Sequence, residues 1–273
     1  REGSLTGAAR RLRVDATTVG RRIAALEQSL GAQVVARPPA GLGLTPTGHQ
    51  IARIAERTEA TAVEVQRVAT GAADLPAGRV RLTTLQDVAD GLVSPLLPTL
   101  RARWPEVRID LWCTTRILDL AAGEADLAIR VGRPTEPDLI ARRLCTLVER
   151  PYASRDWLAA NGLAADAVTD LDGRAVLLLL VEDRWTDGLG RARPALRASA
   201  MSTLIGAARA GMGIVMAPTA LAGGFPELVP LPSLPVSRER ALWLAMPEAL
   251  AGIARIRVVA DLLIAELGEL GPG

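Results

Sequence analysis

The sequence predicts an α/β protein in two parts, a small helical head followed by a larger body in which strands and helices alternate. Apolar residues of the head recur at helical spacing, whereas those beyond Gly78 form the short runs typical of strands set between helices. Charge divides the chain in the same way. Residues 1–50 hold 7 arginines and 3 acidic residues (net +4), and residues 51–273 hold 25 arginines and 27 acidic residues (net −2). This division favours a polyanionic partner for the head and not for the body.

Composition excludes several classes of protein. With 49% hydrophobic and 23% charged residues among 273, the chain has the balance of a globular protein and not of a disordered chain, a collagen or a coiled-coil rod. The longest apolar run, Ala175–Val181, is far shorter than the roughly 20 residues that span a bilayer, and no basic-then-apolar leader opens the sequence. Cys113 and Cys145 are too few for a disulfide framework. We therefore expect a cytoplasmic protein with no membrane partner.

The head begins with two predicted helices separated by a tight turn. Ser4 can cap a helix over Leu5–Leu12, and Asp15 can cap a second over Ala16–Leu30, which Gly31 would end in a left-handed conformation. Apolar residues on the second helix recur at steps of four, three and four: Val19, Ile23, Leu26 and Leu30. A short helix, a turn and an amphipathic helix form the helix-turn-helix pattern.

A hairpin and a long helix complete the predicted head. Gln33–Arg37 and Leu42–Thr45 are expected as short strands, with prolines and a glycine between them that suit a hairpin or wing. A helix is expected from Pro46 to about Gly71, before a hinge at Ala72–Gly78. Its small and apolar residues follow the spacing of a coiled-coil seam: Ile51, Ala55, Thr58, Ala62, Val65 and Ala69. A plain surface helix is the alternative to a dimerisation helix.

The body is predicted as α/β layers on mostly parallel sheets, in one sheet or two lobes. Strands are expected at Arg79–Leu85, Val107–Trp112, Ala125–Val131, Val176–Val181, Gly213–Ala217 and Ala241–Met246. Helices are expected at Val88–Trp104, Ile117–Ala122, Met201–Ala210 and Ala251–Leu267.

The residues offer little for catalysis. His49 is the sole histidine, so a nucleophile–histidine arrangement or a zinc site would depend on it alone, and the cysteines lack ligand spacing. The glycines at 206–213 follow a predicted helix instead of opening one, which is the wrong order for a phosphate loop. We therefore expect no enzyme, no metal and no cofactor. A redox switch between Cys113 and Cys145 is an alternative to two inert thiols.

Nucleic-acid binding has more support from the head. The exposed first turns of the second helix would present Thr17, Thr18, Arg21 and Arg22 to a major groove. Arginines near the turn and the wing suit phosphate contacts: Arg10, Arg11, Arg13 and Arg37. The alternative is an ordinary helix pair with a solvated basic face.

Ordered motifs along the chain resemble the LysR-type transcriptional regulators. In the head they are Gly3–Leu12, Val19–Glu27, Leu30-Gly31 and Leu44–Gly48. In the body they are Gly78–Leu82, Pro95–Pro98, Trp104-Pro105, Gly123–Gly132, Ala210–Ile214 and Pro218. The resemblance runs in order from the first residue to the last predicted helix.

The resemblance implies an α/β fold class with an N-terminal winged helix-turn-helix, a linker helix and a two-lobe effector domain like periplasmic binding proteins. The implied boundaries are 1–48 for DNA binding, 49–72 for the linker and dimerisation helix, and 78–273 for the effector domain. Lobe I would take about 78–149 and 249–268, and lobe II about 150–247, with chain crossings near Glu149–Tyr152 and Met246–Ala249. Family members have a further helix before Gly3, so we expect about 15–20 residues to precede this sequence.

The resemblance also implies a ligand-responsive activator or repressor that assembles as a homodimer or homotetramer. Implied partners are double-stranded promoter DNA, a small-molecule effector and a second copy, with RNA polymerase as a further candidate. The implied effector residues are Thr83, Thr84, Gln86, Asp87, Thr114, Thr115, Ser199, Met201 and Ser202. Helix N-termini there favour an anionic ligand, whereas Asp87 favours a cationic or hydroxylated one, so the charge of the ligand stays open.

One departure from the family pattern bears on base recognition. The family's recognition helix commonly begins Ser-Gln-Pro-Ala-Val-Ser, whereas this sequence has Asp15–Gly20, in which Ala16 lacks the amide that could read adenine. Base contacts are therefore expected from the threonines and arginines above. Two alternatives remain: a two-lobe solute-binding protein or related α/β enzyme with an accessory helical domain, and a regulator whose cleft is filled by side chains.

Overall fold

The computed structural model describes residues 2–36, 42–69, 76–180 and 184–268. The chain forms two compact units: Arg1–Ala73 with Ala122–Glu124, and the remaining residues. We call residues 2–69 the head and residues 76–268 the body. Arg37 and most of the predicted hinge lie outside the described residues.

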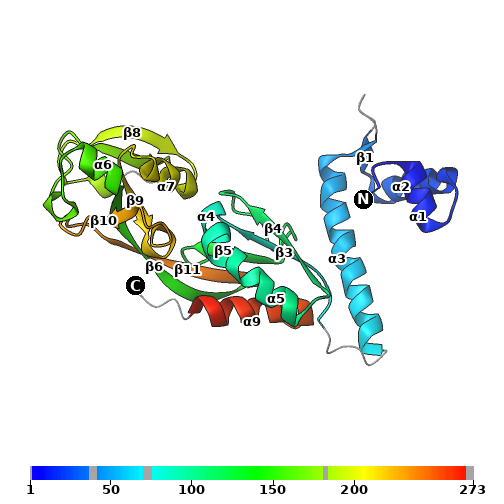
Figure 1. Cartoon of the computed structure of the whole chain (residues 1–273). Coiled ribbons are helices and arrows are strands. Elements are labelled where there is room, and N and C mark those ends of the chain that lie inside the picture. The colour runs from blue at the N-terminus through cyan, green and yellow to red at the C-terminus, as the bar shows by residue number, and fades with distance from the viewer. Residues whose placement is uncertain (1, 37–41, 70–75, 181–183, 269–273) are drawn as a thin grey trace. The chain divides into compact units, whose positions relative to one another are not determined.

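The head contains the predicted helices and hairpin (Figure 1). Helices α1 (Leu5–Leu12) and α2 (Ala16–Leu30) are followed by antiparallel strands β1 (Val35–Ala36) and β2 (Gly43–Leu44) and by the long helix α3 (Pro46–Ala69). The strands are shorter than predicted because only two residue pairs face each other between them.

The first half of the body, lobe I, has three neighbouring strands and two helical segments. The strands are β3 (Gly78–Thr84), β4 (Val107–Cys113) and β5 (Leu127–Val131). One helical segment runs through α4 (Gln86–Val88), the π-turn η1 (Ala89–Val93), the 3₁₀ turn η2 (Ser94–Leu96) and α5 (Leu97–Arg103); the other is α9 (Ala254–Gly268). Pro95 and Pro98 lack the N–H that a regular helix needs, which accounts for the change of helix type within the predicted Val88–Trp104 helix.

The second half, lobe II, repeats this plan with different elements. Its strands are β7 (Ala175–Leu179), β8 (Arg193–Ala198), β9 (Ile214–Pro218) and β10 (Leu228–Pro230). Its helices are α6 (Arg155–Ala160), α7 (Met201–Arg209) and α8 (Thr219–Ala222), with short turns η3 (Ala165–Ala167) and η4 (Arg184–Thr186). A further turn, η5 (Glu248–Leu250), precedes α9.

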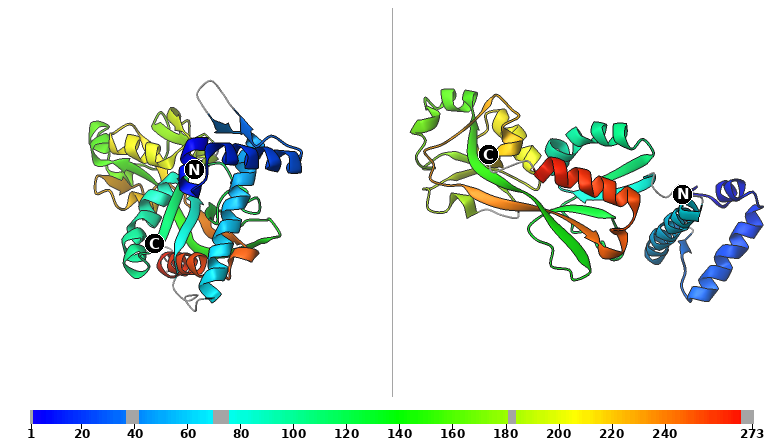
Figure 2. Two further views of the ribbon diagram at one scale, coloured as in Figure 1. Left: turned by 90° about the vertical axis from the view of Figure 1, so that its right-hand side faces the viewer. Right: turned by 90° about the horizontal axis from the view of Figure 1, so that it is seen from below.

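Two long strands join the lobes into one sheet. β6 (Leu139–Ser154) and β11 (Arg238–Pro247) pair antiparallel and run side by side between the lobes (Figures 1 and 2). The sheet has nine strands in the order β4-β3-β5-β11-β6-β9-β7-β8, with β10 on β6. The sheet is therefore mixed and not mostly parallel as predicted. The sequence prediction missed β6, because polar residues such as Arg142, Arg143 and Arg150 interrupt its apolar pattern.

The strand partners place the crossings between the lobes. β6 changes partner from β11 to β9 at Glu149, inside the first predicted crossing. β11 already pairs with lobe I strand β5 at Leu242, so the second crossing lies before the predicted Met246–Ala249. The second crossing implied by the family resemblance thus differs from the one that the strand pairing shows.

Each lobe has a central strand flanked by two parallel neighbours: β3 lies between β4 and β5, and β7 between β8 and β9. In open α/β sheets the crevice outside the carboxyl ends of such strands is where ligands bind. The topology thus directs the search for a site to the end of β3 in lobe I and the end of β7 in lobe II.

The predicted helix at Ile117–Ala122 is not formed. The segment is irregular and ends in a turn, and it buries Leu118 and Leu120 on the outer face of the sheet with Ala128 and Ala245. These two leucines are anchors for a loop instead of one side of a helix.

The two lobes share a continuous apolar core. It includes Leu82 of β3, Leu100 of α5 and Val259 of α9 in lobe I, and it continues to Leu204 of α7 and other lobe II residues. The lobes approach closely where a Cβ built on Gly91 would lie 2.3 Å from Leu221 Cδ2.

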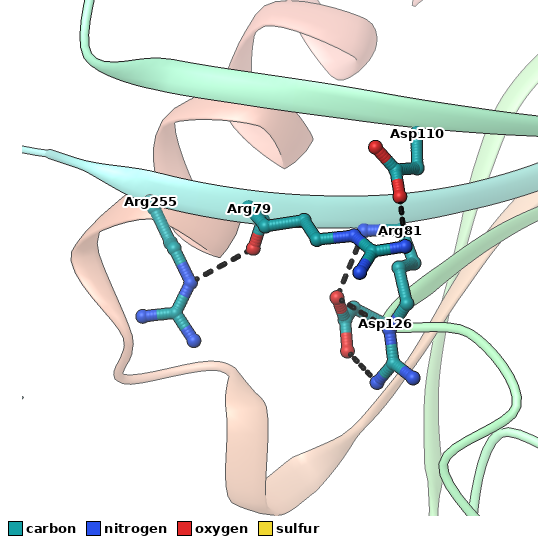
Figure 3. Close-up of polar contacts among 5 residues, drawn as sticks. All are labelled: Arg79, Arg81, Asp110, Asp126 and Arg255. Carbon is teal, nitrogen blue, oxygen red and sulfur yellow. Dashed lines mark hydrogen bonds and ion pairs between the residues drawn. The ribbon is translucent and has the colours of Figure 1, made fainter. Parts of the chain in front are cut away.

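A buried ion pair links β3 to the start of β5 (Figure 3). Arg81 and Asp126 are 8% and 7% exposed, and Nη2 of Arg81 lies 2.7 Å from Oδ1 of Asp126. The Asp126 carboxylate also accepts the Arg81 amide at 2.8 Å, and the Asp126 amide donates to the Arg81 carbonyl at 2.8 Å. The buried guanidinium of Arg81 and the buried carboxylate of Asp126 are therefore paired with each other, as burial of charge requires.

Surface contacts extend from the same strand. Arg79 forms an ion pair with Asp110 of β4, and the Arg79 carbonyl accepts a 3.1 Å hydrogen bond from Nε of Arg255 in α9 (Figure 3). The two arginines of β3 thus bind different neighbours, one buried and one near solvent.

Replacing Asp126→Asn is expected to lower the free energy of unfolding of the body by about 3 kcal/mol, because it leaves the buried Arg81 charge uncompensated. Asp110→Asn is the matched control, and its more exposed pair with Arg79 should contribute less than about 1 kcal/mol. Urea unfolding of both variants tests the difference, and equal losses would contradict the importance given to the buried pair.

Candidate nucleic-acid interface and ligand pocket

Helix α1 has a defined cap at each end. The Ser4 hydroxyl accepts the Gly7 amide at 3.0 Å, and Arg13 ends the helix in the left-handed region (φ 53°) with its amide directed to the Ala9 and Arg10 carbonyls. The Val14 amide donates to the Ala9 carbonyl at 3.0 Å. These bonds set the tight turn that leads into α2.

Asp15 caps α2 with three hydrogen bonds. Its carboxylate accepts the Thr18 amide at 2.7 Å, the Thr18 hydroxyl at 2.8 Å and the Thr17 hydroxyl. The Thr17 hydroxyl, followed by the Thr18 amide and hydroxyl, holds the pKa of Asp15 well below its usual range. Both threonine hydroxyls, predicted as DNA contacts, thus donate their protons to Asp15. Toward another molecule they offer their methyl groups and acceptor lone pairs.

Four arginines of the two helices are exposed. Arg10 and Arg11 lie in the last turn of α1, and Arg11 forms a 2.8 Å ion pair with Glu2. Arg21 and Arg22 lie on α2, and neither has an ion pair within the described part of the chain. The structure therefore leaves all four predicted arginine contacts of the two helices exposed.

Glu27 connects α2 to the first wing strand. Its Oε1 accepts the amides of Val34 and Val35 at 2.8 and 3.0 Å. Sequence reasoning gave this side chain no role. In the sequence, Glu27 is a carboxylate near the end of a helix and shortly before a strand. That position does not distinguish a carboxylate that accepts strand amides from one that faces solvent.

The Leu44–Gly48 motif closes the wing onto α3. The Thr45 hydroxyl donates to the Gln33 carbonyl at 2.7 Å and accepts the Gly48 amide at 2.9 Å. A Cβ on Gly48 would lie 1.9 Å from the Val34 carbonyl oxygen, so only glycine allows this approach. The motif thus fixes where the wing and α3 meet.

Apolar side chains remain exposed on the head. Of the predicted stripe on α2, Val19 is buried, whereas Leu26 and Leu30 are 43% and 46% exposed. On α3, Ile54 is 56% exposed and Ile51 is half-buried. Among the other predicted seam positions, Ala55, Thr58 and Ala62 are exposed, and the side chain of Val65 lies outside the described residues.

Lobe I has a pocket of about 170 Å³ at the carboxyl ends of its three strands, which we call the lobe I pocket. Its lining comes from the strand ends and the segment after β4: Thr83, Thr84, Leu85, Thr114, Thr115, Arg116, Ile117, Leu118, Ile129, Arg130 and Val131. Four predicted effector residues, all threonines, therefore share one pocket at the crevice that the topology indicates.

The hydroxyls of this pocket differ in what they already bind. Thr83 donates to the Trp112 carbonyl at 3.1 Å, and the Thr114 hydroxyl accepts the Arg116 amide at 3.1 Å. The hydroxyl oxygen of Thr84, a residue only 3% exposed, has no hydrogen-bond partner among the residues that the structure describes. Thr84 therefore has an unused donor and acceptor beside the pocket.

Arg130 is held in place by lobe I itself. Its Nη1 binds Glu136 at 2.6 Å and its Nη2 donates to the Leu118 carbonyl at 2.7 Å. The hydrogen bond from Arg130 lowers the pKa of Glu136. Arg116, Ile117, Arg130 and Val131 are pocket residues that the sequence prediction omitted. The sequence predicted the strand that contains Arg130 and Val131. No local sequence pattern indicated that the end of this strand lies beside the segment after β4.

The other predicted effector residues lie outside the lobe I pocket. The Gln86 amide donates to Asp90 at 2.8 Å, and burial raises the pKa of Asp87. Ser199 and Ser202 are exposed at and beside the start of α7 in lobe II.

Met201 is buried and lines a second cavity of only about 10 Å³, together with Glu149 and Arg240. Because α4 contacts α7, these residues belong to the region where the lobes meet.

The described residues give no support to a metal site. They contain no group of three or more histidine, cysteine or acidic side chains able to hold a metal ion. Burial, with Asp90 adding a smaller effect, raises the pKa of the Cys113 thiol, and burial also raises that of Cys145. Higher thiol pKa values lower the thiolate fraction that redox chemistry needs. Within the described residues, no helix is long and apolar enough to cross a membrane.

Comparison with known proteins gives consistent matches over both units. The model of the LysR substrate binding domain matches residues 73–268, and that of the bacterial regulatory helix-turn-helix protein, lysR family, matches residues 1–49. An HTH-type transcriptional regulator of Xanthomonas campestris is 34% identical over 165 residues, 59% of this chain and 47% of that protein. An HTH-type transcriptional repressor of Pseudomonas aeruginosa is 31% identical over 169 residues, 62% and 53% of the two chains. The chain thus spans about half the length of these relatives.

Solved structures resemble the whole chain. CrgA, a LysR-type transcriptional regulator from Neisseria meningitidis, has a TM-score of 0.65 at 25% identity, with 98% of this chain and 95% of that chain covered. ArgP from Mycobacterium tuberculosis has a TM-score of 0.67 at 25% identity, with coverages of 99% and 94%.

Removing the α2 cap by Asp15→Ala is expected to speed hydrogen exchange of the Thr18 amide, because that donor loses its acceptor. Asp15→Ser is the control, since serine also caps helices well. Since the folded-state pKa of Asp15 is lowered, the cap should stay intact at every pH above the usual value of about 3.9 and fail only in stronger acid. An NMR titration of Asp15 with a midpoint at or above 3.9 would contradict the three-bond cap.

Proposed function

This chain belongs to the LysR family of bacterial transcriptional regulators, and from that premise we propose that it binds promoter DNA through the exposed face of α2 and responds to a small molecule in the lobe I pocket. The proposal of DNA binding rests on one observation, the position of Arg21 and Arg22. Both lie exposed on a helix whose start is fixed by Asp15, and neither has an ion pair in the described chain.

The chemistry of these two arginines suits a major groove. A guanidinium can donate two hydrogen bonds to guanine or neutralise a phosphate, and the methyl groups of Thr17 and Thr18 can contact thymine. Arg10 and Arg11 at the end of α1 are placed for backbone phosphates, and Arg11 would exchange its Glu2 partner for a phosphate. Rigid caps on both helices lower the entropy that ordering on DNA would cost.

The proposed response to a ligand depends on the lobe I pocket. It lies at a topological switch point, contains the Thr84 hydroxyl, which has no partner among the described residues, and adjoins the region where α4 contacts α7. A ligand bound there shifts promoter binding only by the difference between its affinities for two arrangements of the protein. The two arrangements can differ in how the lobes are set or in how the copies assemble.

We also propose that α3 mediates self-association into a homodimer, from which a tetramer can be built. Ile54, exposed on α3, adds an apolar residue to the predicted seam beside Ile51. Spacings of three and four residues from Ile51 through Ile54 to Thr58 continue a coiled-coil stripe. The described side chains thus favour a seam that includes Ile54 over the alanine-rich one predicted from the sequence.

The proposed target is chromosomal DNA, so we place the protein in the cytoplasm, with RNA polymerase as a candidate partner at the promoter. The competing function, a solute-binding protein or α/β enzyme with an accessory domain, would use the body and leave the head without a specific DNA site. The exposed Arg21 and Arg22 favour the regulator over that alternative.

Arg21→Ala or Arg22→Ala should weaken operator binding by about 1–3 kcal/mol where the arginine reads a base. Arg108→Ala, which removes an exposed charge from the body, is the control for net charge. Footprinting on the intergenic DNA beside the chain's own gene, at two salt concentrations, separates base reading from phosphate attraction, because the latter falls steeply with salt. Footprints that survive both head substitutions would sink the assignment. Diffuse binding of the unmodified protein to all DNA would favour the solute-binding alternative.

Ile54→Glu is expected to raise the monomer fraction, since it places a charge in the proposed seam. Gln50→Glu introduces the same charge at another exposed position of α3 and should leave the assembly unchanged. Light scattering of the full chain measures both, and an unchanged mass for Ile54→Glu, together with Ile51→Glu, would argue against dimerisation through α3.

A further inference from the structure

We propose that Thr17 reads the C5-methyl group of a thymine in the operator, on the same face of α2 as Arg21. The inference rests on the proposed function of α2 as the DNA-reading helix, and it names the base group that this chain selects there. The neighbouring Thr18 has a different task, which is to hold the start of the helix.

The hydroxyl protons of both threonines are already committed. The Thr17 hydroxyl donates to Oδ1 of Asp15, and the Thr18 hydroxyl donates to Oδ2 at 2.8 Å. The Thr17 hydroxyl, followed by the Thr18 amide and hydroxyl, holds the pKa of Asp15 well below its usual range, so this carboxylate is charged at neutral pH. The two hydroxyls therefore have no proton left for the acceptors on a base edge.

The start of α2 already holds an anion of its own. A helix N-terminus ordinarily offers its free amides to a phosphate group. Here the Asp15 carboxylate accepts the Thr18 amide at 2.7 Å, and its negative charge repels a phosphate. The first turn of α2 is therefore a poor phosphate site, and its exposed side chain is better suited to a base.

Only one of the two threonines is fully accessible. Thr17 is exposed, whereas Thr18 is half-buried and gives both its amide and its hydroxyl to Asp15. A threonine whose hydroxyl is held also has its methyl group held, because a β-branched side chain adopts few rotamers. Thr17 thus offers an ordered methyl group at an exposed position of the helix.

Small neighbours on the same helix face allow close approach to the bases. Helical spacing places four residues on this face: Thr17, Gly20, Arg21 and Ala24. Gly20 and Ala24 have no long side chain that would hold the helix away from the floor of the groove. Four residues span about 6 Å of helix, which is roughly two base steps of about 3.4 Å. A thymine at Thr17 and a guanine at Arg21 are therefore expected about two base steps apart.

The thymine methyl is the group that this arrangement can distinguish. The Thr17 oxygen keeps its lone pairs, but amino groups that could donate to them occur on both adenine and cytosine, so they do not identify a base pair. Among the four bases, the C5-methyl group occurs on thymine alone. An apolar contact between two methyl groups is thus the selective interaction that remains to Thr17.

Uracil interference on the intergenic DNA beside the chain's own gene tests the proposal with the full chain. Deoxyuridine in place of thymidine removes only the C5-methyl group. Binding should fall about fourfold at one thymine in each protected half-site, which corresponds to about 0.8 kcal/mol for one buried methyl group. An absence of response at every protected thymine overturns the proposal.

Substitutions at Thr17 locate the contact. Each variant is compared with itself on two synthetic duplexes, with thymine or deoxyuridine at the responding position, so a partial loss of folded protein leaves the ratio unchanged. Thr17→Ser keeps the hydroxyl and removes the methyl group, and it should bind the two duplexes equally. Thr17→Val removes the hydroxyl and keeps a branched apolar side chain, and it should still prefer thymine about fourfold.

Two further variants serve as controls. Thr18→Ser makes the same change at the half-buried threonine and should keep the preference for thymine, whatever it does to overall affinity. Thr6→Ser makes the change at an exposed position of α1 and should bind as the parent does. A preference that survives Thr17→Ser, or that Thr18→Ser abolishes instead, overturns the assignment to Thr17.

The footprint on unmodified DNA separates this inference from the proposed function. A specific footprint that is insensitive to uracil overturns the reading of a methyl group and leaves the regulator. The lack of any specific footprint overturns the regulator, and the methyl contact with it, because no operator thymine is then read.

Discussion

The body depends on the Arg81–Asp126 pair, because that pair fixes how β3 meets β5. Each partner is nearly inaccessible to water, so neither charge is tolerated without the other. The Asp126 amide also donates to the Arg81 carbonyl, and the Arg81 amide donates to the Asp126 carboxylate, directly before the register in which Leu82 pairs with Leu127. Thr83 and Thr84 follow directly on β3, so the ion pair determines where the pocket hydroxyls lie.

The pocket is consequently built from segments that are distant in the sequence. β4 and β5 flank β3 on opposite sides, and the chain after β4 returns across the outer face with its leucines buried there. That return places Arg116 and Ile117 beside the end of β3. The set of hydroxyls and arginines that line the pocket then follows from which residues each strand end supplies.

In the head, the equivalent constraint is the capping of short helices. Asp15 orders the first turn of α2 by using the two threonine hydroxyls, which is why we propose the arginines one turn later for base contact. Glu27 and Gly48 join α2, the wing and α3 through backbone contacts that other side chains would disturb. The proposed DNA site and the proposed ligand site belong to different units, so an effect of one on the other would be a coupling between arrangements of the units and would act in both directions.

The sequence by itself determined the features that depend on near neighbours. The caps at Ser4 and Asp15, the helices of the head and most of the body's short strands follow from spacing and capping within a few residues. Tertiary structure decided the features that depend on distant partners. The polar pattern of β6 hid a 16-residue strand that is stabilised by pairing with β11, and the apolar run at 117–122 became a loop anchor instead of a helix. Arg116 and Arg130 join one pocket because strand order brings their segments together, and pairing between strands far apart in the chain leaves no local pattern from which it could be predicted.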